Sequence, residues 1–281
     1  MRIESSAINR IISLICYLFT QTLKVINLKR VVFKVGSSVL TETTSIAKER
    51  MLNLVSLIVE VQKKCEVVLI TSGAVAAGYT ALKLDRKKQI SKKLLAAVGQ
   101  PILMSSYKNK FDIYGLDIAQ ILLTEEDFDS RSHTKIFQDI IDRALENNIL
   151  PIVNENDIST TPDQLFGDND QLSAHVTHYI NADMLVLLSD IDGYYDANPH
   201  ENPKAKVRKL VHEIKEEELT QMHSPNNEFA TGGIVTKLHA AKYILSKNRK
   251  MFLCNGFDLK GARDFLIDGV HSTGTLFINK K

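Results

Sequence analysis

The sequence predicts an α/β protein with a mostly parallel central sheet that is covered by helices on both faces. Short, uninterrupted apolar segments recur along the chain, as in strands that are buried on both sides. A segment with helical periodicity separates most of them, and this alternation is typical of parallel sheets. With 281 residues, of which 44% are hydrophobic and 24% charged, the chain is long enough for a substantial core.

Seven strands are expected, because in each the apolar residues run without interruption between polar or glycine-containing turns. Their ranges are Arg30–Val35, Glu66–Thr71, Leu116–Thr124, Ile149–Asn154, Ala182–Asp190, Lys250–Asn255 and Gly274–Asn279.

Seven helices are expected between and after these strands, from apolar residues that recur at helical spacing. In the first helix Leu52, Val55 and Ile58 share one side. Pro101 predicts a break in the third, because proline lacks the N–H that a helix interior needs. The ranges are Ser45–Lys64, Ala74–Leu82, Ser91–Lys110, Thr134–Asn147, Asn169–Tyr179, Gly233–Lys247 and Leu259–Leu266.

Residues 1–28 are expected to be an N-terminal extension to a single domain at residues 29–281. Their apolar stretch, Ile11 to Phe19, is shorter than the ~20 residues of a membrane span. No small-residue cleavage site follows it, although a signal peptide remains an alternative. An over-long gene start, or an amphipathic helix that packs on the body or on a partner, is favoured, and no membrane is expected as a partner.

Charge and cysteine content exclude other classes of function. The formal net charge is +2, from 35 basic and 33 acidic residues, so no concentrated basic face for nucleic acid is expected. Cys16, Cys65 and Cys254 are far apart and fit no metal or redox spacing. Dispersed, reduced thiols favour a cytoplasmic protein.

Polar residues gather at the ends of four predicted strands. Lys34, Gly36 and Ser37 lie at the first of these ends, and the other groups follow three later strands. Ligands of parallel sheets collect where the carboxyl ends of strands meet, so the sequence predicts one site at this edge. The other groups are Ser72 with Gly73, Asn154 through Asp157, and Ser189 with Asp190.

Three motifs supply the chemistry, and each also has a plain structural explanation. "TSGAVAAG" places Ser72 and Gly73 at a helix start that can bind an anion, or Ser72 is only an N-cap. "NEND" and "FGDND" concentrate carboxylates that need cations nearby, although such residues also dominate turns. "TGGIVTK" can hold phosphates at a glycine-rich helix start, or Lys237 only faces solvent.

No protein-held metal is expected. His175 and His178 are three residues apart on a predicted helix, but no third ligand is evident in the sequence. A pair in the core or on the surface is favoured over a metal site.

Eight segments occur in the order of a known family: "FKVGSSVLT", "ITSGAVAAGY", "LLAAVGQ", "QILLT", "PIVNENDIST", "FGDNDQLSA", "LSDIDGYYDANP" and "TGGIVTKLHAA". From about Lys29 to about Ile278 the chain resembles the amino acid kinase family, within it the branch that phosphorylates L-glutamate. "NEND" and "FGDND" distinguish this branch from carbamate, aspartate, uridylate and acetylglutamate kinases. The resemblance implies an αβα sandwich and transfer of a phosphoryl group from ATP to the glutamate side-chain carboxylate, the first step of proline biosynthesis.

The resemblance also implies roles for individual residues. Lys34 and Lys237 would contact the transferred phosphoryl group, and Asp170 would position them. Ser72, Gly73, Asn154, Asp157, Asp168 and Asn169 would bind glutamate. The ATP site would contain Lys34, Gly36, Ser37, Ser189, Asp190, Thr231, Gly232, Gly233, Ile234, Val235, Thr236 and Lys237. Mg²⁺ would bind mainly through the nucleotide, a homo-oligomer is expected, and the product would be passed to glutamate 5-semialdehyde dehydrogenase.

The sequence departs from the family pattern at a few places. Leu165 stands where many members have a lysine, and Ile234 replaces a common methionine. No C-terminal PUA domain is expected. A sister kinase with another acceptor and a catalytically inactive metabolite sensor remain alternatives, although both lysines and all the acidic residues are present.

Overall fold

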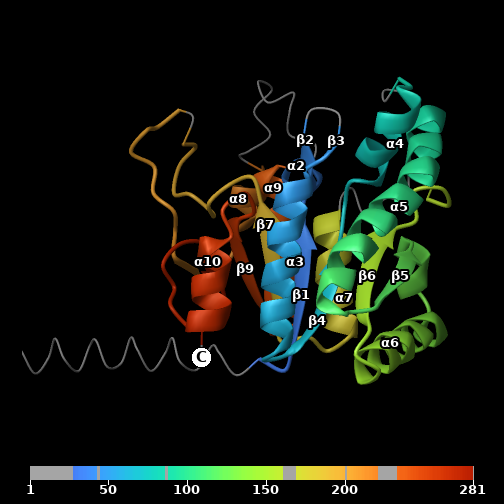
Figure 1. Cartoon of the computed structure of the whole chain (residues 1–281). Helices are drawn as coiled ribbons and strands as arrows, with labels where there is room; N and C mark the ends of the chain where they lie inside the picture. Colours follow the sequence, from blue (N-terminus) through green and yellow to red (C-terminus); the bar gives the residue numbers. More distant parts are fainter. Residues whose placement is uncertain are drawn as a thin grey trace, which may run out of the picture.

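The computed structural model describes residues 28–42, 45–85, 88–160, 169–199, 201–220 and 233–280 of the chain (Figure 1). The predictions for the extension before residue 28, and for Leu165, Asp168, Thr231 and Gly232, lie outside the described residues. Within the described ranges, no helix is long and apolar enough to cross a membrane.

An eight-stranded sheet forms the centre of the molecule, in the order β5-β6-β4-β1-β7-β9-β10-β8. Its first six strands are parallel, β10 is antiparallel to β9, and β8 is parallel to β10. All seven predicted strands and the mostly parallel sheet are confirmed; β8 and the short hairpin β2–β3 were not predicted. The strands are β1 Arg30–Val35, β2 Thr41–Glu42, β3 Ser45–Ile46, β4 Glu66–Ile70, β5 Ile118–Leu123, β6 Leu150–Glu155, β7 Met184–Ser189, β8 Leu210–Val211, β9 Lys250–Asn255 and β10 Thr275–Phe277.

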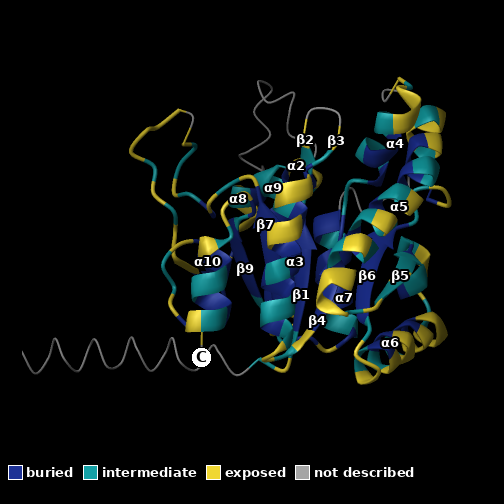
Figure 2. Ribbon diagram, in the orientation of Figure 1, coloured by how far each residue is buried: buried dark blue, intermediate teal, exposed yellow. Residues whose placement is uncertain are grey.

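Helices cover both faces of this sheet, and its central strands are largely buried between them, whereas the edge strands β5 and β8 are partly exposed (Figures 1 and 2). One face packs against α2 Ser37–Leu40, α3 Lys48–Gln62, α4 Ala74–Leu82, α5 Gln89–Phe111 and α10 Lys260–Arg263. The other packs against α6 Arg131–Glu146, α7 Asn169–Tyr179, α8 Glu216–Thr220 and α9 Ile234–Ser246. Short turns of 3₁₀ helix, Asp112–Tyr114 and Glu125–Phe128, and of π helix, Asp264–Asp268, complete the described elements.

The predicted break at Pro101 is wrong, because α5 continues from Gln89 to Phe111 without interruption. Helix α5 lies so close to α4 that a Cβ added to Gly99 would be 1.8 Å from the carbonyl oxygen of Ala74. Proline inside a helix costs roughly 3 kcal/mol. The close contact with α4 stabilises the helical conformation on both sides of Pro101 and offsets this cost.

Candidate active site

Lys34 lies in the middle of the sheet, and the alternation of β1 decides which way its side chain points. Val31, Phe33 and Val35 pack into the core under α3 and α5, whereas Val32 packs into the core under α7 and α9. Successive side chains of a strand point to opposite faces, so Lys34 shares the face of Val32. Its ammonium group therefore meets the helices that begin with the "ND" and "GGIVTK" motifs.

A buried ion triad joins these three elements. Lys34 Nζ lies 2.5 Å from Oδ1 of Asp170, the second residue of α7. Lys237 Nζ, in the first turn of α9, lies 3.1 Å from Oδ2 of the same carboxylate. The hydroxyl of Thr236 is 3.2 Å from Oδ2. One carboxylate thus orients two ammonium groups that are 203 residues apart in the chain.

The triad is almost completely removed from solvent. Asp170 is fully buried, and Lys34 and Lys237 are 5% and 6% exposed. Burial alone would raise the pKa of Asp170, but the charges and hydrogen bonds of Lys34 and Lys237 lower it to about 2. The carboxylate of Asp170 holds the two ammonium groups side by side, and neighbouring lysines attract negatively charged groups. The arrangement is therefore suited to receiving an anionic ligand.

A second cluster, of amides, begins at the neighbouring residue of α7. Asn169 Nδ2 donates to the carbonyl oxygen of Thr71 (2.6 Å) and to Oδ1 of Asn154 (2.9 Å), and it lies 3.0 Å from Oγ of Ser72. Thr71 and Ser72 follow β4, which lies next to β1, and Asn154 lies near the end of β6, the next strand beyond β4. Three of the predicted glutamate-binding residues, Ser72, Asn154 and Asn169, are thus brought together.

Gly73 explains how the chain turns from β4 into α4. Its φ of 104° lies in the left-handed region, which a residue with a Cβ rarely adopts. No side chain caps the start of α4, so the backbone beside Ser72 remains available to a ligand. This geometry is consistent with the predicted role of the "TSG" turn.

Asp157 lies on the turn after β6 and is linked to α5 by lysines. Burial raises its pKa, and the nearby charges of Lys92 and Lys93 oppose this effect. The ammonium group of Lys93 donates to the carbonyl oxygens of Ile158 and Thr160, so it fastens the turn to α5. No hydrogen bond joins Asp157 to the amide cluster in the part of the chain that is described.

The predicted ATP residues lie on the opposite side of Lys34. Ser189 ends β7, the other neighbour of β1, and its hydroxyl donates to Asp190 at 2.9 Å. The N–H of Gly36 donates to the carbonyl oxygen of Leu188, which places Ser37 and the start of α2 beside this strand end. Gly233 precedes α9 without any side-chain cap, so the N–H groups of its first turn, formed by Ile234, Val235 and Thr236, can face an anion.

Sequence reasoning missed two polar residues of α5, Gln100 and Tyr107, whose side chains bond to residues of the amide cluster. Gln100 accepts a hydrogen bond from Asn154 Nδ2 at 2.9 Å. Tyr107, fully buried, bonds the Thr71 hydroxyl at 2.8 Å. A polar residue directly after Gly99 in the "LLAAVGQ" segment was the available signal, but helical spacing alone does not show which side of the sheet edge it faces.

A metal ion bound directly by the protein needs several ligand side chains close together. The described residues contain no group of three or more acidic, histidine or cysteine side chains that could hold one. Both oxygens of Asp170 are taken by lysines. The described residues thus contain no ligand set that would compete with an ion held through the phosphate oxygens of a nucleotide.

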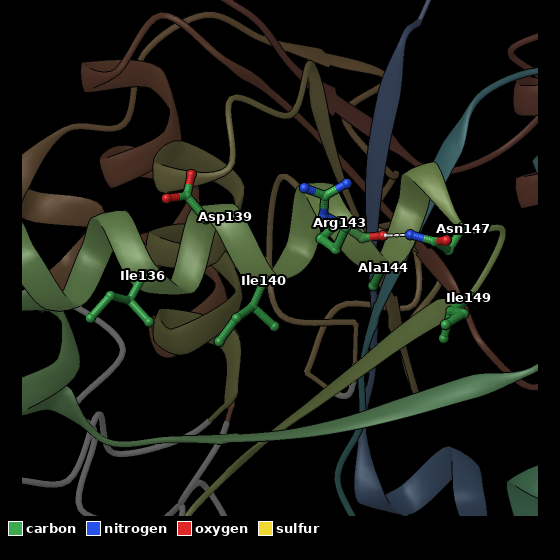
Figure 3. A pocket seen from close by; sticks show the side chains of 7 residues that line it. All are labelled: Ile136, Asp139, Ile140, Arg143, Ala144, Asn147 and Ile149. Atoms are coloured by element: carbon green, nitrogen blue, oxygen red, sulfur yellow. Dashed lines mark hydrogen bonds between the residues drawn. The ribbon is translucent and has the colours of Figure 1, made fainter.

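A groove lies elsewhere, on the outer side of α6 (Figure 3). Its volume is about 530 Å³, and it is lined by Ile136, Asp139, Ile140, Arg143, Ala144, Asn147 and Ile149. None of these residues belongs to the triad or to the amide cluster.

Comparisons with known proteins agree with this geometry. A family model described as the amino acid kinase family matches residues 29–255. The chain is 50% identical over 256 residues to glutamate 5-kinase of Wolinella succinogenes, covering 89% of this chain and 98% of that protein. It is 46% identical over 254 residues to glutamate 5-kinase of Leishmania donovani, covering 90% and 97%. The solved structure of an isopentenyl phosphate kinase from T. acidophilum is similar in fold alone, with a TM-score of 0.61 and 14% identity over 89% of this chain and 100% of its own.

Proposed function

Because the chain belongs to the amino acid kinase family, we propose that it transfers the γ-phosphoryl group of ATP to the side-chain carboxylate of L-glutamate. The product would be L-glutamyl 5-phosphate, and the reaction would be the first step of proline biosynthesis. The identity to proteins named glutamate 5-kinase supports the acceptor. The triad of Lys34, Asp170 and Lys237 is the observation that carries the proposal.

The triad suits a reaction in which two anions must approach each other. A carboxylate oxygen of glutamate attacks the γ-phosphorus, and the bond from that phosphorus to the β–γ bridging oxygen breaks, so that ADP leaves. The side-chain carboxyl has a pKa near ~4.3 and is already ionised at neutral pH, so no general base is needed. Lys34 and Lys237 would neutralise the charge that spreads over the phosphoryl oxygens. Asp170 would hold both lysines in place without contacting the substrate.

The amide cluster would hold glutamate beside this centre. Asn169 is the neighbour of Asp170 in α7, so the same helix start orients both the lysines and the amides. Ser72, Gly73 and Asn154 lie at adjoining strand ends, and Asp157 would bind the α-ammonium group of the substrate. Asp168 is proposed for this set on sequence grounds.

ATP would lie on the β7 side of Lys34. Gly36 and Ser37 leave room for phosphates against the backbone, and the open start of α9 offers N–H groups and Lys237. Bound Mg²⁺ would neutralise phosphate oxygens and fix the conformation of the triphosphate. Ser189 and Asp190 would line the nucleotide site, together with residues 231–237.

The chain is also proposed to form a homo-oligomer in the cytoplasm and to supply a glutamate 5-semialdehyde dehydrogenase. Ile136 and Ile140 are 57% and 49% exposed on the outer face of α6, beside Asp139 and Arg143 (Figure 3). Two antiparallel α6 helices of two copies would bring Asp139 of each near Arg143 of the other. Such a contact would bury the isoleucines of both copies and would exchange the ion pairs Lys135–Asp139 and Arg143–Glu146 within each helix for pairs between the copies.

Release of ADP in the presence of ATP, Mg²⁺ and L-glutamate tests the proposed reaction. ADP release should depend on L-glutamate, and aspartate, carbamate and UMP should not replace it. Lys34→Met with Lys237→Met should abolish this release and provide the blank. Glutamate-independent ADP release, or equal rates with another acceptor, would show that the assignment is wrong.

A further inference from the structure

The side chain of Gln100, which joins the amide cluster through Asn154, has a nitrogen without a hydrogen-bond partner among the described residues. Its Oε1 accepts from Asn154, but its Nε2 is buried and has no hydrogen-bond acceptor. Native proteins rarely leave a buried N–H group unpaired, because the group has lost its hydrogen bonds to water and gained none in return. Something that binds the protein is therefore expected to accept from this nitrogen.

The orientation of the Gln100 amide follows from backbone groups whose polarity is unambiguous. The carbonyl oxygen of Thr71 can only accept, so the Asn169 atom 2.6 Å away must be its nitrogen. The N–H of Glu155 can only donate, so the Asn154 atom 2.9 Å away must be its oxygen. Both assignments also agree with the bond from Asn169 to Asn154.

These two bonds also determine how the side-chain amide of Gln100 is oriented. Since Asn154 presents its oxygen to Asn169 and Glu155, its nitrogen must face Gln100. The Gln100 atom at 2.9 Å must then be the oxygen, because only an oxygen can accept there. The usual ambiguity between the two ends of an amide is thereby removed. The free end of Gln100 is a pair of N–H donors, which requires an acceptor.

The order of the strands indicates which part of the substrate reaches Gln100. Lys34 is on β1, Ser72 follows β4, and Asn154 is on β6, three strands that are consecutive in the sheet. Neighbouring strands are about 4.8 Å apart, so Asn154 lies about 10 Å from Lys34 along the edge. When one end of glutamate is held at the lysines, the other end points toward β6 and Gln100.

From this placement we propose that Gln100 is a specificity-determining residue whose Nε2 donates to the α-carboxylate of the substrate. This inference rests on the proposed function, in which the side-chain carboxylate lies at Lys34 and Lys237. Asp157, on the turn after β6, is on the same side and would take the α-ammonium group. The α-amino-acid end of glutamate is thus recognised by a donor from α5 and an acceptor from the β6 turn.

The substitution Gln100→Glu removes the donor and places a negative charge where the α-carboxylate would bind. It keeps the shape and the oxygen that accepts from Asn154, but it replaces the nitrogen by a second oxygen. The KM for L-glutamate should rise about 10- to 100-fold, because hydrogen bonds to charged groups are worth about 1.5–3 kcal/mol and each 1.4 kcal/mol is tenfold. The KM for ATP should stay within about twofold of the unsubstituted protein.

A substrate analogue makes the test specific to the α-carboxylate. The α-amide of L-glutamic acid keeps the reacting side-chain carboxylate but presents a nitrogen donor at the other end. The preference in kcat/KM for L-glutamate over this α-amide should fall about tenfold or more in Gln100→Glu, because the amide nitrogen can donate to the introduced carboxylate. Gln89→Glu, an exposed change at the start of the same helix, should leave both quantities unchanged.

The outcomes separate the failure of this inference from failure of the proposed function. Absence of glutamate-dependent ADP release from the unsubstituted protein refutes the function. If that release is normal, an unchanged glutamate KM and an unchanged α-amide preference in Gln100→Glu overturn the role of Gln100. Should Gln100→Glu not fold, Gln100→Met, which is uncharged and of similar length, replaces it. A glutamate KM in Gln100→Met equal to that of the unsubstituted protein overturns the inference equally.

Discussion

The charge states of individual buried side chains in this protein depend on the groups that they contact. Asp170 is an example, because desolvation alone would favour its neutral form, whereas the charges and hydrogen bonds of Lys34 and Lys237 favour its ionised form. The three charges stabilise one another and would be costly separately in a buried place. Removing any member is therefore expected to destabilise the protein as well as to impair function, because a buried charge loses its partner.

Replacing Lys237 by alanine should lower kcat by at least 10²- to 10³-fold, the usual cost of losing one group that stabilises transition-state charge. The affinity for ATP should change much less, since backbone N–H groups of α9 remain. Initial rates and calorimetric titration with ATP measure the two effects. Lys242→Ala, in the same helix but bonded to Glu216 at the surface, is the matched control. Near-normal turnover in Lys237→Ala would disprove its catalytic role.

Asp157→Asn should weaken glutamate binding about tenfold or more, with little change for ATP, because a carboxylate that pairs with the α-ammonium is lost. The raised pKa of Asp157 adds a pH signature. Glutamate affinity of the unsubstituted protein should start to fall, as pH decreases, above the pH at which an ordinary aspartate is protonated. Titrations with glutamate at several pH values measure this, and equal losses for glutamate and ATP would count against the assignment.

At the scale of elements, the pairing of α4 with α5 holds the glutamate side of the site in place. Gly78 and Gly99 lie where the two helices touch, and an added Cβ at either would lie within 2 Å of a backbone carbonyl oxygen. Helix α4 begins directly after Gly73, and α5 carries Gln100. The distance between the helices therefore also sets the distance between the "TSG" turn and Gln100.

Gly99→Ala should reduce the free energy of unfolding by about 1–3 kcal/mol or more, because backbone atoms must move to admit the methyl group. Urea denaturation gives this quantity. Ser105→Ala, at an exposed position of the same helix, should change stability by less than about 0.5 kcal/mol. Equal stability of Gly99→Ala and the unsubstituted protein would contradict the close contact of α4 with α5.

A second pair of elements, α7 and α9, is packed through aromatic rings. The ring of His175 stacks on Tyr243 at 4.2 Å between centroids, with Phe128 at 5.6 Å. Burial lowers the pKa of His175 to about 4, helped by the charges of His178 and Lys247. These are the helices that carry Asp170 and Lys237, so their packing also fixes the triad.

Acid should therefore loosen this interface. The unfolded chain binds a proton at His175 with a pKa near 6.5, whereas the folded protein does so only near 4, so stability falls as pH falls through this range. His175→Phe should reduce the loss between pH 6.5 and 4 by about 1–2 kcal/mol, allowing for partial exposure of the ring. Urea midpoints at several pH values measure it. The exposed His133→Gln should leave the pH dependence unchanged.

At the scale of the whole molecule, one edge of the sheet is β5, and α6 lies near this edge (Figures 1 and 2). Ile136 and Ile140 of α6 are exposed. Arg30 ties α6 to the centre of the sheet through Asp142 at 2.8 Å. The position of the outer face of α6 is thus fixed relative to the site.

Ile140→Lys should convert the proposed oligomer into smaller species, because a charge on the groove of α6 opposes its burial. Light scattering on the eluting protein measures the mass. Asp139→Arg should have a similar effect, and Asp139→Arg combined with Arg143→Asp should restore the oligomer. Ile113→Lys, at another exposed position, is the control. A mass that none of these changes alters would place the interface elsewhere.

The sequence was sufficient to predict the order of the main elements and the edge at which the polar residues meet. Strands such as β1 and β7 can be recognised in the sequence, because parallel strands buried on both faces need continuous apolar runs. The continuity of α5 through Pro101 was not predictable, because it depends on contact with another helix. The strand β8 and the hairpin β2–β3 were too short to leave a pattern.

The sequence by itself determined the strand–helix alternation, the residue types at each strand end and the resemblance to a kinase family. Only the tertiary structure decided that Lys34 and Lys237 share the carboxylate of Asp170, and that Asn169 bonds Thr71 and Asn154. Those bonds in turn determine which end of the Gln100 amide is oxygen and which is nitrogen. A sequence pattern shows the periodicity of apolar and polar residues within one strand or helix. Which distant residue a side chain contacts depends instead on the order and spacing of the strands in the folded sheet.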